Sequence, residues 1–150
     1  MPHLAFDCRG RLGGYREELA GEARRALVGA AAAAGLGPDH ELSLILSDGP
    51  WIRRVNKRWR GIDRATDVLS FPLHELKPGK LPPPGAVGDI VVCLPEVRRA
   101  ARQMGVCPAA HMRLLLVHGL LHLLGYDHDI PAREAQMARR AHQILEAVRP

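Results

Sequence analysis

The sequence predicts a single α+β domain. Segments typical of strands and of helices are intermixed along the chain, and they form only some of the strand–helix–strand units that a parallel sheet requires. The length of 150 residues suits one domain, and the hydrophobic (47%) and charged (25%) fractions are those of ordinary globular proteins. We therefore expect one domain over residues 1–150, and we exclude the disordered and fibrous classes.

The N-terminal part is predicted to form two strands on either side of a helix. Residues 3–8 are a short strand candidate. Residues 15–34 are rich in Ala, Glu and Arg, carry apolar side chains on one helical face and stop at Gly35, as a helix does. Residues 41–47 alternate between polar and apolar side chains, which is typical of a half-buried strand.

The middle of the chain is predicted to form a helix, a strand and a long loop. Asp48 is a suitable N-cap for a helix that has Pro50 in its first turn. Residues 66–71 form the third predicted strand, which Pro72 ends. Residues 72–86 contain five prolines and two glycines, so we expect an irregular loop there.

The C-terminal part is predicted to form one strand and three helices. Residues 87–94 are the fourth predicted strand, and a helix follows over residues 95–104. The most apolar helix begins at Pro108 and ends at Gly125. Pro131 begins a last, amphipathic helix that runs to about Val148.

The chain is basic, with 21 Lys and Arg against 16 Asp and Glu and a net charge of +5. Positive charge concentrates in one segment, opposed there only by Asp63, and its residues are Arg53, Arg54, Lys57, Arg58, Arg60 and Arg64. Such a basic face favours a nucleic-acid partner, although charge alone fits a solvated helix surface equally well. The aromatic content of only 4% argues against a sheet that stacks successive bases.

The cysteines and the apolar segments predict where the protein works. Cys8, Cys93 and Cys107 are odd in number and lack paired spacing, so we interpret them as reduced, mostly buried thiols of a cytosolic protein. The N-terminal segment lacks the pattern of a signal peptide, and no apolar run is long enough to span a bilayer. We expect a soluble, cytoplasmic protein that does not contact a membrane.

The strongest chemical signal is a group of three histidines. His118 and His122 are four residues apart, so on a helix both imidazoles lie on one face, one turn apart. Gly125 ends such a helix and lets the chain turn back, which brings His128 toward the same position. Three neutral imidazoles with an open fourth position are typical of a catalytic zinc site. We therefore predict that these histidines bind one Zn²⁺; the alternative is that they are core histidines satisfied by hydrogen bonds.

The residue that follows the first of these histidines bears on the reaction. Zinc peptidases have a glutamate at this position, where it acts as the base that activates water. This chain has Gly119, which cannot transfer a proton, so peptide hydrolysis is disfavoured. Phosphodiester cleavage needs mainly charge stabilisation, which a zinc ion and a well-placed arginine can supply.

A second motif precedes the histidines and, together with them, carries a family resemblance. The residues involved are Asn56, Trp59, Arg60, Asp63, the run Thr-Asp-Val-Leu-Ser-Phe-Pro from Thr66 to Pro72, Gly88-Asp89-Ile90, and His-Gly-Leu-Leu-His-Leu-Leu-Gly-Tyr-Asp-His from His118 to His128. In these motifs and in the order of its elements, the chain closely resembles the YbeY family of bacterial rRNA maturation endoribonucleases. Ala65 departs from the family pattern, which often has proline there, and the proline-rich loop is individual to this chain.

The resemblance implies a fold and a reaction. The fold is a mixed, mostly parallel four-stranded sheet packed with about five helices, including a metal-binding helix like that of zinc peptidases. His118, His122 and His128 are the implied ligands of one zinc ion, and Arg60 is the implied catalytic residue that contacts the RNA phosphate. The implied activity is zinc-dependent, single-strand-specific endoribonuclease cleavage in 16S rRNA 3′-end maturation and ribosome quality control.

The resemblance also implies partners, and one rival function remains open beside it. The partners are single-stranded RNA or rRNA, the small ribosomal subunit, a ribosomal protein and an assembly GTPase. The rival is a non-catalytic ribosome-assembly factor, in which zinc stabilises the C-terminal helices and the basic face binds rRNA. The residues do not decide whether water or the RNA 2′-hydroxyl attacks the phosphate.

Four side chains near the motifs have two interpretations each. Asp127 could accept a hydrogen bond from a ligand histidine or stabilise the local turn. Asp67 and Ser70 could line the cleft or make local hydrogen bonds. His111 lies seven residues before His118, on the same helical face, where it could support a ligand or belong to the core or the surface.

Overall fold

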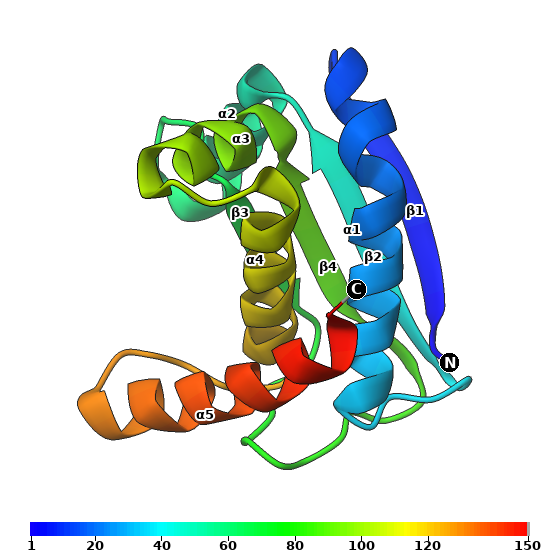
Figure 1. Cartoon of the computed structure of the whole chain (residues 1–150). Coiled ribbons are helices and arrows are strands. Elements are labelled where there is room, and N and C mark those ends of the chain that lie inside the picture. The colour runs from blue at the N-terminus through cyan, green and yellow to red at the C-terminus, as the bar shows by residue number, and fades with distance from the viewer. Residues whose placement is uncertain (150) are drawn as a thin grey trace.

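A computed structural model describes residues 1–149 and contains one four-stranded sheet in the order β1-β2-β4-β3 (Figure 1). The strands are β1 (His3–Arg9), β2 (His40–Ser47), β3 (Val68–Pro72) and β4 (Gly85–Cys93). β1, β2 and β4 run parallel to one another, and β3 pairs antiparallel to β4 at one edge. The predicted mixed, mostly parallel sheet is confirmed.

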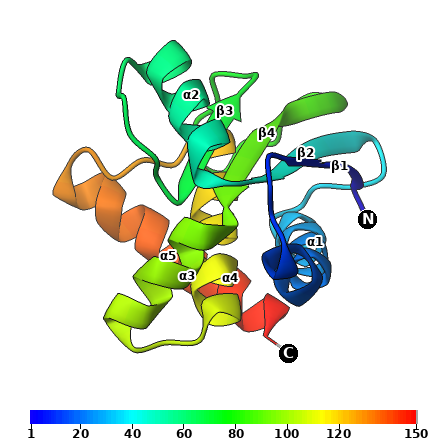
Figure 2. The same ribbon diagram turned by 90° about the horizontal axis from the view of Figure 1, so that it is seen from above.

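Within residues 1–149, five helices pack on the two faces of this sheet, which agrees with the prediction of about five helices. They are α1 (Gly14–Ala33), α2 (Gly49–Arg60), α3 (Leu94–Met104), α4 (Pro108–Leu123) and α5 (Pro131–Val148). Seen from above, α2 lies on one face of the sheet, and the other helices lie on the opposite face (Figure 2). Most of α4 is buried in the larger core, which explains why its sequence is apolar on nearly all sides.

The ends of α2 are set by local interactions, of which the sequence analysis predicted those at the N-terminal end. The carboxylate of Asp48 accepts the backbone N–H of Trp51 at 3.0 Å, which is the predicted N-cap, and Pro50 lies in the first turn. The second oxygen of Asp48 accepts the N–H of Arg11 at 2.8 Å, which ties the segment after β1 to the start of the helix. Gly61 ends α2 in the left-handed conformation (φ 72°), so Arg60 is its last residue.

Two predicted boundaries are wrong in the central region. β3 begins at Val68 and not at Thr66, and β4 begins at Gly85, inside the predicted loop. Gly85 and Ala86 pair with residues of β2, and a register shift then leaves Val87 without a counterpart on that strand. Local composition cannot predict this pairing, because the partner strand lies some forty residues earlier in the chain.

The prediction that the cysteines are mostly buried is also wrong. All three are free thiols, but only Cys93 is buried; Cys8 is half-buried and Cys107 is exposed. Cys107 has a local structural use, because its sulfur accepts the N–H of Ala110 at 3.4 Å at the start of α4. A helix N-cap lies at the surface whenever the first turn does, which explains the exposure of this thiol.

Within residues 1–149, no single helix has both the length and the apolar composition needed to cross a membrane. α3 and α4 meet the length and composition criteria only when they are taken together, and the two helices are bent by 113° relative to each other.

Candidate active site

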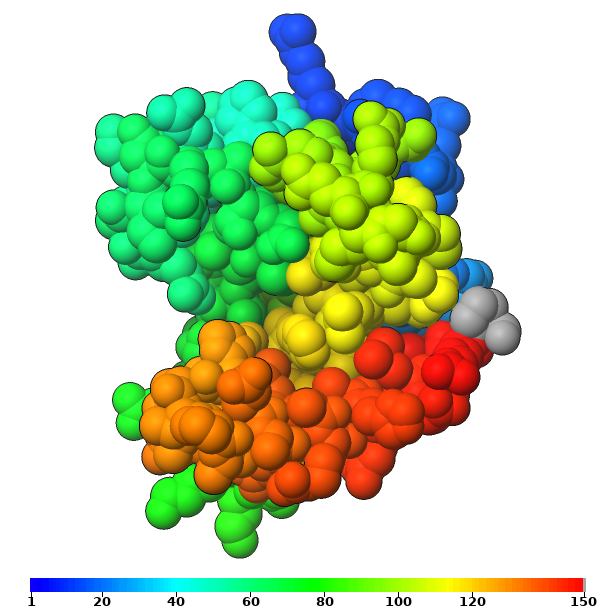
Figure 3. Space-filling model, turned by 60° about the vertical axis from the view of Figure 1, so that its left-hand side comes forward, coloured from blue at the N-terminus to red at the C-terminus, as the bar shows by residue number. Residues whose placement is uncertain are grey.

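A cleft of about 700 Å³ lies between the end of α2, the edge strand β3 and the C-terminal half of α4. Its lining includes all four predicted site residues, Arg60, His118, His122 and His128. The space-filling view shows the hollow between the green segment that follows α2 and the orange segment that leads into α5 (Figure 3). The fold therefore brings together, in one cleft, residues that are as far as 68 positions apart in the sequence.

His118 and His122 lie one turn apart on α4, and both are half-buried. Burial lowers the pKa of each imidazole, and the neighbouring histidines lower it further; for His122 the charge of Arg60 acts in the same direction. Both rings are therefore neutral near pH 7, which is the form in which imidazole binds a metal ion.

The hydrogen bonding of His122 selects one tautomer. Its Nδ1 lies 3.1 Å from the backbone carbonyl oxygen of Tyr126, which can only accept a hydrogen bond. The proton of the neutral ring therefore sits on Nδ1, and Nε2 keeps its lone pair. A backbone carbonyl that orients the ring in this way is the usual support of a metal-ligating histidine.

Gly125 directs the chain back toward the cleft after α4. It adopts φ 93°, and the N–H of Tyr126 donates to the carbonyl of Leu121 at 2.9 Å, which closes the end of the helix. The ring of His128 then lies 5.2 Å from that of His122, measured between centroids, with an angle of 78° between the planes. The predicted return of the chain is therefore present, although His128 itself is exposed.

The three imidazoles share the cleft without forming a closed ligand set. Among residues 1–149, no three His, Cys, Asp or Glu side chains are arranged as a ready-made metal site. The donor chemistry nevertheless fits zinc, because two of the rings are neutral and one has its tautomer fixed with Nε2 available. Closing the set around an ion requires a local rearrangement of side chains.

Arg60 enters the same cleft from the end of α2. Its Nη2 donates to the carbonyl oxygen of Ser70 at 2.9 Å, and its Cζ lies 5.6 Å from the centroid of the Phe71 ring. None of the ion pairs between described residues includes Arg60. This guanidinium is oriented by neutral groups, and its positive charge is free to bind an anion.

The side chains with two interpretations now have defined surroundings. Asp127 accepts the backbone N–H of His128 at 2.7 Å, so it stabilises the turn. Ser70 lines the cleft, whereas Asp67 is not among the lining residues. His111 is buried, its Nε2 lies 3.6 Å from a carboxylate oxygen of Asp67, and neither ring nitrogen has a hydrogen-bond partner in the described structure.

Sequence reasoning missed the part of the cleft that comes from the loop after β3. His74, Glu75 and Leu76 line the cleft, and the Nε2 of His74 donates to the carbonyl of Ala86 at 3.0 Å. The prolines predict that this segment is irregular, but they do not predict on which side of the sheet edge it lies. Tyr126 was also missed as the partner of His122, although it stands between the second and third histidines of the motif.

The packing of Gly119 supports the prediction against a peptidase. A Cβ atom at this position would lie 3.3 Å from Cγ2 of Ile90, because α4 packs closely against β4 there. A larger side chain at this position would require the Ile90 side chain to shift by a few tenths of an ångström. With glycine here, the chain lacks the carboxylate that zinc peptidases carry at this position.

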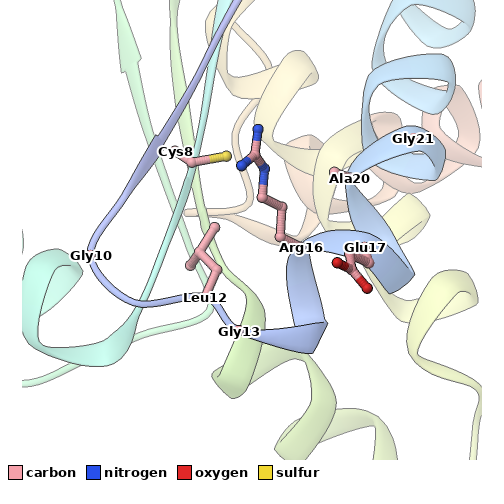
Figure 4. A pocket seen from close by; sticks show the side chains of 8 residues that line it. All are labelled: Cys8, Gly10, Leu12, Gly13, Arg16, Glu17, Ala20 and Gly21. Carbon is pink, nitrogen blue, oxygen red and sulfur yellow. The ribbon is translucent and has the colours of Figure 1, made fainter.

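A second cavity, of about 560 Å³, lies between the end of β1 and the start of α1. The thiol of Cys8 and the guanidinium of Arg16 point toward each other across it (Figure 4). This cavity contains none of the predicted site residues.

Comparison with known proteins identifies the family. The family model described as Endoribonuclease YbeY matches residues 13–149. The chain belongs to the YbeY endoribonuclease family. The YbeY motifs inferred from the sequence therefore lie in a chain that matches the family over nearly its whole length.

Individual YbeY relatives agree with this assignment. The Endoribonuclease YbeY of Moorella thermoacetica is 43% identical over 137 residues, which cover 88% of each chain. That of Anaeromyxobacter sp. is 46% identical over 130 residues, covering 83% of this chain but only 64% of its own length. The solution structure of TM1509 from Thermotoga maritima matches with a TM-score of 0.60 and 26% identity, and covers 97% of this chain and 88% of that one.

Proposed function

We propose that this YbeY-family protein is a zinc-dependent endoribonuclease that cleaves single-stranded rRNA. In this proposal His118, His122 and His128 hold one zinc ion, and Arg60 is the catalytic residue that contacts the scissile phosphate. The proposed substrate is the 3′ end of the small-subunit rRNA, in the cytoplasm, during maturation and quality control. A ribosomal protein and an assembly GTPase are the proposed partners. The relatives are named Endoribonuclease YbeY, which supports the reaction class.

One observation carries the proposal. A guanidinium that has no carboxylate partner among residues 1–149 lines the same cleft as three imidazoles, although they come from two distant parts of the chain. If the arginine had only a structural role, we would expect it to pair with an acidic side chain. If the histidines had only a structural role, we would expect hydrogen bonds to all their ring nitrogens. The combination instead suits a phosphate group beside a metal ion.

In this proposal some residues bind the phosphate or the metal ion, and others orient the binding groups. Arg60 donates one N–H group to the carbonyl of Ser70, which fixes the plane of the guanidinium. Its other N–H groups remain available to a phosphate. The carbonyl of Tyr126 holds the proton of His122 on Nδ1, so that Nε2 remains a donor of its lone pair. When bound, zinc polarises a phosphoryl oxygen and lowers the pKa of water.

Charge stabilisation by Arg60 is the main contribution expected from the protein itself. Negative charge increases on the phosphoryl oxygens as the new bond forms, and a donor already in position costs no reorganisation. His118 and His122, on the α4 side of the cleft, are half-buried, whereas Arg60 is exposed and can reach a phosphate from solvent.

The proposal is tested with a single-stranded fragment of small-subunit rRNA. Zinc-loaded wild type, His118→Ala and Arg60→Ala are compared by initial cleavage rate, after circular dichroism has established that each is folded. The matched control is Arg102→Ala, which removes an exposed arginine from the last turn of α3. We expect strong loss for the two cleft variants and wild-type cleavage for the control. The chemical form of the new ends, linear or 2′,3′-cyclic phosphate, identifies the attacking group.

Two results contradict the proposal in different ways. Equal cleavage by all four proteins means that a contaminating nuclease cuts the RNA. RNA binding without cleavage, combined with unfolding on loss of zinc, supports instead the non-catalytic assembly factor.

A further inference from the structure

Trp59 is the only one of the six aromatic residues that is exposed, and all six lie in the described part of the chain. The residue is 64% exposed, and it directly precedes Arg60 at the end of α2. Leaving an indole in water forgoes a large amount of hydrophobic free energy. Among the aromatic side chains of the described residues, Trp59 is thus the exception.

The geometry of α2 explains how Trp59 comes to be exposed. Ile52 and Asn56 are the buried residues of this helix, and Trp59 continues their face one turn further on. The small core beneath α2 contains Ile52, Leu69, Val91 and Cys93, with Trp51 and Val55 packed against it, and Trp59 is not part of it. The apolar face of the helix thus extends beyond the core that it covers.

The surroundings of Trp59 are basic. The Cζ of Arg58 lies 5.1 Å from the centroid of the indole ring. Asp63 pairs with Arg53 at 2.8 Å and lies 4.0 Å from Lys57. No ion pair between described residues includes Arg54, Arg58 or Arg60. An apolar ring amid unpaired guanidinium groups suits a partner that is anionic and also presents flat, apolar faces. A single-stranded nucleic acid has both properties.

We propose that Trp59 stacks on a nucleobase of single-stranded RNA, next to the phosphate that Arg60 contacts. This inference rests on the proposed function and adds a base contact to it. Trp59 and Arg60 are consecutive residues of α2, about 1.5 Å apart along the helix axis and about 100° apart around it, so Trp59 lies beside the cleft that Arg60 enters. A phosphate at Arg60 therefore leaves the base of a neighbouring nucleotide within reach of the indole. In a duplex both faces of a base are already stacked, so this contact selects single strands.

The two tryptophans of the chain allow a direct test. Trp51→Phe leaves Trp59 as the only tryptophan, and Trp59→Phe leaves only Trp51, which packs against the small core. Each protein is titrated with an end-labelled, 2′-O-methylated single-stranded ten-mer that resists cleavage. Label anisotropy reports binding, and tryptophan emission reports stacking. We expect the emission of Trp59 to be quenched in parallel with the anisotropy change, and that of Trp51 to stay constant.

Affinity gives a second measurement. Trp59→Ala is expected to weaken binding of the single strand by about 5- to 150-fold, the range for loss of one stacked base, and to leave binding of the same sequence as a duplex unchanged. Trp59→Phe, which keeps an aromatic face, is expected to retain part of the affinity. Because Trp59 lies outside the core, these variants should fold, which circular dichroism checks.

Each contrary outcome has a distinct meaning. If RNA binds while the emission of Trp59 and the affinity of Trp59→Ala stay unchanged, stacking is overturned and the proposed function stands. Equal weakening for single strand and duplex overturns the selection of single strands. If no variant binds RNA, and wild type does not either, both proposals fail.

Discussion

The guanidinium of Arg60 donates a hydrogen bond to the backbone carbonyl of Ser70, with 2.9 Å between Nη2 and the oxygen. This bond joins the last residue of α2 to the edge strand β3, inside the cleft that α4 closes from the other side. Because the acceptor is a backbone atom of a paired strand, the sheet itself determines where the arginine lies.

Arg60→Lys separates positive charge from guanidinium geometry. Lysine keeps the charge but cannot bind the Ser70 carbonyl and a phosphate through one planar group. We expect the single-turnover cleavage rate to fall by roughly 10²- to 10³-fold, as for other losses of a transition-state donor, with RNA affinity changed far less. Rapid-quench kinetics with saturating enzyme measures the rate, and a lysine variant that cleaves like wild type would refute the role assigned to Arg60.

Zinc is expected to stabilise the folded protein. At about 100 times its dissociation constant, a ligand that binds only the folded state contributes about 2.7 kcal/mol, which corresponds to an increase in Tm of about 5–10 °C for a domain of this size. Differential scanning fluorimetry with added zinc or a chelator measures the shift. His118→Ala should abolish it, whereas His142→Ala, which changes a histidine 76% exposed on α5, should preserve it. A shift of wild-type size in the His118 variant would exclude that residue as a ligand.

Gly125→Ala is expected to destabilise the fold and the cleft together. A Cβ at this position would clash with the carbonyl oxygen of Leu76, and φ is 93°. The strained backbone alone costs about 1–3 kcal/mol, and displacement of the loop adds to this. The control is Gly21→Ala, in α1 with open space around it, which should stabilise by about 0.5–1 kcal/mol. Urea unfolding compares the two; equal effects would contradict the close contact of loop and helix end.

Glu22 is expected to make stability depend on pH. Its side chain is 15% exposed; burial raises the pKa of the carboxyl, but hydrogen bonds from Arg113 and Arg25 outweigh this and lower the pKa below its usual 4.5. A lowered pKa in the folded state contributes stability above the unfolded pKa, and this is lost as pH falls through the folded value. The stability difference between wild type and Glu22→Gln should be constant above about pH 6 and shrink below about pH 4.5.

Urea unfolding at several pH values measures this difference. The exposed Glu17, on the same helix, is the control, and Glu17→Gln should change the free energy of unfolding by less than about 0.5 kcal/mol throughout. A difference between wild type and Glu22→Gln that does not vary with pH would contradict the ion pair between α1 and α4.

Short-range sequence patterns were sufficient to predict most of the helix ends and the histidine motif of this protein. The N-cap at Asp48, the left-handed ends at Gly61 and Gly125 and the spacing of His118 and His122 depend on neighbours within one or two helical turns. The two histidines of α4 that line the cleft could therefore be predicted from the motif alone, whereas Leu115 could not. Family membership, too, follows from these local motifs.

Contacts between distant segments decided the rest. Composition predicts a loop after Pro72, but only packing brings Leu76 against Gly125 and extends β4 back to Gly85 through pairing with β2. Helical spacing places Trp59 on the same face as Ile52, and only the tertiary structure shows that the small core does not reach it. The periodicity of a sequence shows which side of a helix or strand is apolar. How much of that side is buried depends on segments that are distant in the sequence and pack against it in the folded protein.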